Sequence, residues 1–138
     1  MTLLTNGGHA RDLYEDLYRE IFGELAGVTM PMPLTPPAEP PVVDARRHIG
    51  RYERAGTVQE ILIDDEGPLL RMTITGPLAE LLPDPTEELR MTPVDESGDL
   101  FVVRQPGALT WTPVTFYGLP TGEKYMHFGV RATPKVSG

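Results

Sequence analysis

The sequence predicts a mainly β protein: an antiparallel up-and-down barrel or half-barrel of about 7–8 strands, preceded by one amphipathic helix and a proline-rich linker. Three observations predict it. Two β-rich runs, Ile49–Asp64 and Leu69–Thr75, meet at the turn Asp65–Pro68. Within the second run, apolar residues such as Leu70 and Met72 alternate with polar ones, as in a strand with one buried face. Similar short runs, separated by turn signals, then continue to the C-terminus.

Composition limits the classes of protein that the chain can belong to. A chain of 138 residues with 40% hydrophobic content is long enough for one domain with a sizeable core. Its 12 basic and 20 acidic residues give a formal net charge of -8, which disfavours nucleic acid as a partner. The absence of cysteine excludes disulfides and thiolate metal sites. Without a signal-peptide pattern or a long apolar run, we expect a soluble, cytoplasmic protein with no membrane contact.

The N-terminal part begins with a short apolar segment that two glycines interrupt, and a helix is then predicted from His9 to Ala26. Gly27 is placed to end that helix. Apolar residues fall four apart along one side of it, and an aromatic row runs beside them; the two rows are Leu13, Leu17, Ile21, Leu25 and Tyr14, Tyr18, Phe22. Acidic residues dominate the opposite side, so we expect the apolar side to pack on protein instead of a membrane surface.

Residues 28–43 read as a linker, because six prolines within them exclude both a helix and a regular strand ladder. A semi-rigid extended spacer is the favoured interpretation. The alternative is that Pro36–Pro41 is a ligand for a proline-binding module.

Residues 44–138 are predicted to hold the strands, which we expect at Ile49–Arg54, Thr57–Asp64, Leu69–Thr75, Glu88–Val94, Leu100–Arg104, Thr110–Gly118 and Glu123–Ala132. Sequential short strands without helices between them form a meander, and a meander removes its exposed edges by curling closed. An open sandwich is the alternative. Between the strands, Gly76–Pro83 has leucines at helical spacing, and we expect one helical turn that plugs a barrel end.

The sequence assigns no catalytic residue, no metal ligand and no cofactor. Its two serines, Ser97 and Ser137, lie outside any nucleophile motif. The three histidines, at positions 9, 48 and 127, lack metal-ligand spacing. Adjacent acids such as Asp64 and Asp65 are typical of turns, and the glycines are too spread out for a phosphate loop.

The candidate site residues are side chains expected to fill the barrel or to line a ligand cavity inside it. Arg131, near the end of the last predicted strand, is expected to place its guanidinium over the ring of Tyr52 on the first. The full set of candidates is Tyr52, Met72, Trp111, Phe116, Tyr125, Phe128 and Arg131.

Several segments carry a resemblance to a known family. The opening residues 3–8 and the helix up to Gly27 resemble the end of the catalytic domain in serine hydrolases of the class C β-lactamase and penicillin-binding-protein-like family, which implies a short last sheet strand followed by a C-terminal helix. Ile49–Glu53, residues 100–103, Thr112–Tyr117 and His127–Pro134 are similar to the lipocalin-like barrel appended to many such enzymes. The family's Ser-x-x-Lys, Tyr-x-Asn and Lys/His-Thr-Gly elements are missing from the chain, so the resemblance implies that they lie upstream of Met1.

The resemblance implies three segments: the end of a catalytic domain (1–27), the linker (28–43) and an antiparallel barrel (44–138). It predicts a non-catalytic accessory domain that shapes substrate access or assembly in a hydrolase of the esterase or peptidase class, with the catalytic domain as its partner in the same chain. The alternative is an independent lipocalin-like carrier of a small apolar ligand, and a weaker one is an enzyme of unknown type. In a chain that lacks the catalytic domain, the apolar row Leu13, Leu17, Ile21 and Leu25 is expected to form a homodimer contact; the alternative is that the linker lets this row pack on the chain's own barrel.

Overall fold

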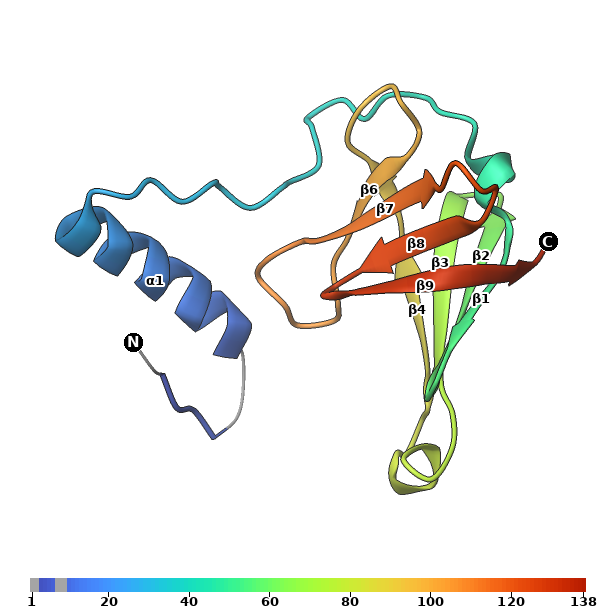
Figure 1. The fold of residues 1–138 in the computed structure, drawn as a ribbon, viewed down its shortest axis with the longest axis horizontal. Coiled ribbons are helices and arrows are strands. Elements are labelled where there is room, and N and C mark those ends of the chain that lie inside the picture. The colour runs from blue at the N-terminus through green and yellow to red at the C-terminus, as the bar shows by residue number, and fades with distance from the viewer. Residues whose placement is uncertain (1–2, 7–9) are drawn as a thin grey trace.

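The computed structural model describes residues 3–6 and 10–138, and within them it contains one α-helix and nine antiparallel strands (Figure 1). Residues 3–6, expected to belong to a short strand, are not in one; His9 lies outside the described residues. The helices are α1 (Ala10–Ala26) and the 3₁₀ turns η1 (Ala45–His48) and η2 (Ala79–Leu81). The strands are β1 (Gly50–Arg54), β2 (Thr57–Asp64), β3 (Gly67–Ile74), β4 (Thr86–Arg90), β5 (Thr92–Pro93), β6 (Leu100–Val103), β7 (Thr112–Gly118), β8 (Lys124–Phe128) and β9 (Arg131–Ser137).

The strands form one sheet that curls into a nearly closed barrel, which confirms the predicted fold class. Its order is β4-β3-β2-β1-β9-β8-β7-β6-β5. The two edge strands β4 and β5 are consecutive in the chain and separated only by Met91, so the sheet returns to where it began. The structure has more strands than expected for two reasons. Glu88–Val94 is broken at Met91, and the predicted strand Glu123–Ala132 is a hairpin that turns at Gly129, where φ is +66°.

The hairpin at the centre of the prediction is β2–β3, paired from Thr57 with Ile74 to Asp64 with Gly67. Leu70, predicted to face inward, is fully buried, but Leu69 on the opposite face is buried as well, so burial along β3 does not strictly alternate. Met72, two residues further along the same face, is only partly buried and borders a surface hollow with residues of β4.

The barrel interior is filled with side chains that form one cluster. Tyr52 and Phe101 lie at its centre with at most 1% of their surface exposed. The other buried members are Ala45, Ile61, Leu70, Leu89, Met91, Val103, Val114, Phe116 and Met126, with Val43 and Phe128 packed against them. Large aromatic side chains therefore occupy the space that a ligand would need inside the barrel.

First and last strands meet at Gly50, where the backbone leaves no room for a side chain. Its φ is +141°, and a Cβ built there would lie 2.3 Å from the carbonyl oxygen of Ser137 in β9 and 2.6 Å from Cε of Lys135. The register between β1 and β9 also shifts between Arg51 and Tyr52. Glycine at this position allows β9 to close the barrel against β1.

Gly50→Ala is therefore expected to lower the free energy of unfolding by about 2–4 kcal/mol, through both the backbone strain and the clash with β9. Gly56→Ala is the matched control, because Gly56 also has a positive φ, +79°, but open space where its Cβ would be. Urea unfolding of both variants separates the loss of stability due to backbone strain from the loss due to the clash with β9. Equal losses of stability would show that β9 closure does not depend on Gly50.

The segment Gly76–Pro83 does form a helical turn, η2, but the prediction that it plugs a barrel end is wrong. Its leucines face solvent; Leu81 is 79% exposed. The turn at Gly76, with φ +78°, begins a β3–β4 connection that extends away from the barrel, seen below it in Figure 1. η2 therefore does not cover the barrel end.

Helix α1 begins at Ala10 and ends as predicted at Gly27, whose φ is +62°. Gly27 N–H donates to the Gly23 carbonyl and Val28 N–H to that of Phe22, both at 3.1 Å, which is the hydrogen-bond pattern of a glycine C-cap. No helix among the described residues is long and apolar enough to cross a membrane.

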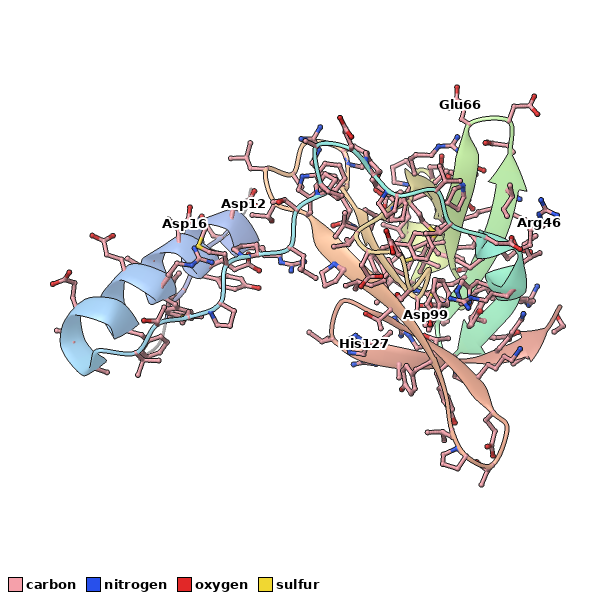
Figure 2. All side chains as sticks on the ribbon, turned by 90° about the horizontal axis from the view of Figure 1, so that it is seen from above. Asp12, Asp16, Arg46, Glu66, Asp99 and His127 are labelled. Carbon is pink, nitrogen blue, oxygen red and sulfur yellow. The ribbon has the colours of Figure 1, made fainter. Side chains whose placement is uncertain are left out.

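The helix lies beside the barrel and contacts it through polar groups near its first turn (Figure 1). Asp12 accepts hydrogen bonds from the N–H groups of Leu109 and Thr110 and from the Thr110 hydroxyl, at 3.2, 3.0 and 2.6 Å. Arg11 donates to Oγ1 of Thr112 at 2.8 Å. Figure 2 shows Asp12 at the end of the helix nearest the barrel, with Asp16 further away.

No residue of α1 is buried, so the expected packing of its apolar side is not found within the described chain. The charged side faces protein instead: Arg11, Glu15 and Arg19 line a groove with linker residues and Trp111. Leu13 is 53% exposed and Leu25 83%. The helix thus presents an apolar surface without a partner among the described residues.

Candidate functional site

A pocket of about 200 Å³ opens at the barrel end that η1 covers. Its walls come from η1, from the loop that leads into β6 and from the β7–β8 hairpin. The lining residues are Arg47, His48, Tyr52, Asp99, Phe116, Tyr117, Gly118, Lys124 and Tyr125. Phenyl and phenol rings, an imidazole and charged side chains of both signs therefore surround one small space.

The turn η1 positions His48 at the floor of this pocket. Asp44 caps the turn by accepting a hydrogen bond from the Arg46 N–H at 3.0 Å. The ring of His48 is then buried against the core, stacked on Phe116 with centroids 3.9 Å apart and a 10° angle between the planes, with the edge of Phe101 beside it. The barrel core thus holds the imidazole in one orientation.

A hydrogen bond determines which ring nitrogen of His48 carries a proton. Its Nε2 lies 2.7 Å from the Gly98 carbonyl oxygen, so this nitrogen must carry the proton and donate it. Arg47 Nε lies 3.3 Å from the same atom, but Nε2 cannot accept from it while donating to Gly98. Burial lowers the pKa of His48, against the opposing effects of the Gly98 carbonyl and Asp99. His48 is accordingly a neutral donor to the loop.

An ion pair holds the loop before β6 against η1. Arg47 contacts Asp99 at 2.9 Å and donates to the Ser97 carbonyl. Asp99 also lies 3.2 Å from Nε2 of His48. Gly98 has φ +67°, and a Cβ there would lie 3.1 Å from the guanidinium of Arg47. This glycine therefore lets the loop approach Arg47 closely.

Two tyrosines form the outer wall. Tyr117 in β7 pairs with Tyr125 in β8, and their rings stack 5.6 Å apart with planes at 14°. They point away from the core because their neighbours Phe116 and Met126 are buried in it. Deeper in, the Tyr52 hydroxyl donates to the His48 carbonyl at 3.0 Å, and burial raises the pKa of Tyr52 to about 12.

Both lysines of the chain lie at this end of the barrel. Lys124 lines the pocket, and Nζ of Lys135 lies 5.9 Å from the centroid of the Tyr52 ring. The pKa of Lys135 is lowered, mainly by burial and further by the charge of Lys124. Positive charge therefore gathers here in a chain whose net charge is -8.

The structure brings three of the sequence candidates to the pocket. Tyr52 and Phe116 are core residues that also reach its floor, whereas Tyr125 lies on the outer face of the barrel, not in its interior. Phe128 packs against the core from a partly buried position.

The remaining candidates lie elsewhere. Met72 is in a separate surface hollow that it shares with residues of β4. Trp111 precedes β7, and Arg104 lies over its ring at 5.1 Å. Arg131 is exposed and pairs with Phe128, so the predicted contact with Tyr52 is wrong: β8 and β9 form a hairpin, which places Lys135 opposite Tyr52 instead.

The serines and histidines form no catalytic arrangement among the described residues. The Ser97 hydroxyl donates to Asp95 and accepts from the Asp99 N–H at 3.1 Å, while His48 is engaged with the Gly98 carbonyl. No group of three potential metal ligands is found in the described part of the chain.

Sequence reasoning did not select His48, Asp99, Tyr117 or Lys124 as site residues. The signal that could have been used was Asp44, a residue type that caps helical turns, followed by basic residues and a histidine just ahead of β1. Nothing in the sequence indicated that this turn would meet Asp99, 51 positions beyond His48 in the chain.

No family model and no curated protein matches the sequence. Among solved structures, the "Crystal structure of SurE with D-Leu" is similar, with a TM-score of 0.56 and 23% sequence identity. The match covers 95% of this chain but 28% of that one, so this chain spans little more than a quarter of its length. At this identity the likeness is one of fold.

Proposed function

We propose that the chain is the C-terminal, non-catalytic part of a serine hydrolase of the class C β-lactamase and penicillin-binding-protein-like family. In this proposal α1 is the last helix of the catalytic domain, the prolines are the spacer, and the barrel is an accessory domain that shapes substrate access or assembly. The observation that carries it is α1, a helix of 17 residues of which none is buried.

An amphipathic helix normally gains its stability by burying its apolar side. In this chain the described residues cover that side only in part, with Leu13 and Leu25 more than half exposed, while its charged side faces the linker. A catalytic domain preceding the helix would supply the missing surface. The fold likeness supports this arrangement, because 95% of this chain matches part of a chain several times longer.

The packing of the barrel favours an accessory role over a carrier role. A carrier of the lipocalin type needs an interior cavity for its ligand. Here Tyr52, Phe101 and Met126 occupy the interior, each with at most 1% of its surface exposed. The pocket beside them is small and opens at the barrel end.

One similar solved structure is of SurE with D-Leu, and we extend that ligand to the parent enzyme as part of the proposal. The parent would then act on ester or peptide bonds next to a D-amino acid residue. Hydrolysis by the parent of D-leucyl and L-leucyl ester reporters tests this extension, with preference for the D form expected. Equal rates on the two reporters, or preference for the L form, would contradict it.

The DNA upstream of the Met1 codon gives the direct test of the parent domain. An open reading frame that encodes Ser-x-x-Lys and Tyr-x-Asn elements is expected there. A stop codon followed by a promoter immediately before Met1 would contradict the proposal.

The 138-residue chain itself is expected not to hydrolyse ester or β-lactam reporters above the buffer rate. The physical reason is that the Ser97 hydroxyl donates to Asp95 in an exposed turn, and no described histidine is hydrogen-bonded to it. Spectrophotometric assays of the wild-type chain and of Ser97→Ala check this. Turnover that disappears in Ser97→Ala would refute it.

A further inference from the structure

We propose that the pocket between η1 and the β7–β8 hairpin binds a small organic anion, a monocarboxylate that carries an aromatic ring. The inference goes beyond the accessory role and does not depend on it, because every residue it uses belongs to this chain. Three features support it: the shape and chemistry of the walls, the balance of charge, and the rigidity of the floor.

The walls fit a flat apolar group. Tyr117 and Tyr125 form a stacked pair on one side, and Phe116 and Tyr52 lie toward the core. A space of about 200 Å³ bounded by such rings can take one phenyl ring and a short side chain. Aromatic rings prefer offset or edge-on contact with one another, which this arrangement offers from more than one side.

The charged residues in and beside the pocket favour an anionic ligand. Among the charged lining residues, Asp99 is already neutralised by Arg47 at 2.9 Å. Lys124 has no ion pair among the described residues, and Lys135 adds a second positive charge behind Tyr52. A carboxylate near Lys124 would gain a charge-assisted hydrogen bond in a partly apolar setting.

The same balance disfavours a zwitterion. An ammonium group on the ligand would meet Lys124 and Arg47, and the acidic residue of the lining, Asp99, is engaged by Arg47 and by His48. The pocket should therefore distinguish an acid from the corresponding amino acid, which has the same skeleton and one added positive charge.

The floor is rigid enough to hold such a ligand in place. His48 is fixed by stacking on Phe116 and by its bond to the Gly98 carbonyl, and Tyr52 is fixed by its bond to the His48 carbonyl. Preformed sites lose less entropy on binding than mobile ones.

Titration of the isotope-labelled 138-residue chain at pH 7, followed by two-dimensional amide NMR, tests the proposal. Hydrocinnamate is the probe; its neutral amide and phenylalanine are the matched comparators with the same skeleton. Saturable shifts are expected at Gly118, Lys124 and Tyr125 with a roughly millimolar dissociation constant, as for a ligand of this size. Both comparators are expected to bind about tenfold more weakly or worse, which corresponds to about 1.4 kcal/mol.

Lys124→Gln is expected to weaken hydrocinnamate binding about tenfold, and Lys124→Arg to restore most of it. Lys124 is exposed, so neither change should affect folding, and the unperturbed spectrum of each variant verifies that. Arg46→Gln is the control, because Arg46 is a neighbouring exposed cation that does not line the pocket. Equal binding of acid and amide, equal binding of phenylalanine, loss of binding in the control, or no saturable shift would each overturn the proposal.

Discussion

Leu70→Asp is expected to destabilise the barrel by several kcal/mol and to leave much of the chain unfolded at room temperature. Leu70 is fully buried, opposite Ile61 in β2 and Leu89 in β4, and both of these partners also belong to the core. A carboxylate placed there has no polar partner and no access to water, so its burial adds to the loss of apolar packing. Circular dichroism and urea unfolding measure the effect.

Arg71→Asp is the matched control on the adjacent, outward-facing position. Arg71 forms an exposed ion pair with Glu88 at 2.8 Å, and such a pair contributes about 1 kcal/mol or less. Repulsion between the new carboxylate and Glu88 adds a similar small amount. A loss of stability in Arg71→Asp as large as that in Leu70→Asp would contradict the assignment of inward and outward faces in β3.

The alternation in β3 explains why the fold class could be predicted from sequence. A period of two records which face of a strand is buried, and it is a local signal that needs no knowledge of the partner strands. The register of β1 against β9, which closes the barrel, is instead set by residues far apart in the sequence. The close approach of Gly50 to Ser137 joins residues at opposite ends of the barrel domain, and nothing in either segment indicated it.

Two errors have one origin, a turn that the sequence signals only weakly. Glu123–Ala132 was expected to be a single strand because Gly129 alone is a weak turn signal between two β-rich runs. Treating it as one strand placed Arg131 at the end of the barrel's last strand, where it would meet Tyr52. The hairpin instead adds β9 beside β1 and brings Lys135 to that ring.

The candidate site was less accessible to sequence reasoning than the fold. Tyr52 and Phe116 could be recognised as strand-borne aromatics, which are usual core residues. The contact of His48 with Gly98 and Asp99 joins the 3₁₀ turn before β1 to the loop before β6, and only the closed sheet brings them together. Polar loops carry no periodicity from which such a meeting could be inferred.

The last expected result concerns α1, whose apolar side has no partner among the described residues. The side consists of two rows: Leu13, Leu17, Ile21, Leu25 and Tyr14, Tyr18, Phe22. Leu13 and Leu25 are more than half exposed, and the others are at best partly buried. Together they present several hundred Å² of apolar surface, which is more than a soluble monomer commonly leaves in one patch.

We therefore expect the isolated 138-residue chain to form a symmetric dimer through α1, since a twofold interface lets the same row cover itself on both copies. Sedimentation velocity of the wild-type chain should show the dimer, and the double variant Leu17→Glu with Ile21→Glu should sediment as a monomer, because four like charges would then meet at the interface. Glu20→Gln with Glu24→Gln is the control: both residues are exposed on the same helix, and the dimer should persist. A monomeric wild-type chain, or a dimer that survives the double Glu variant, would show that this side of α1 is not the interface.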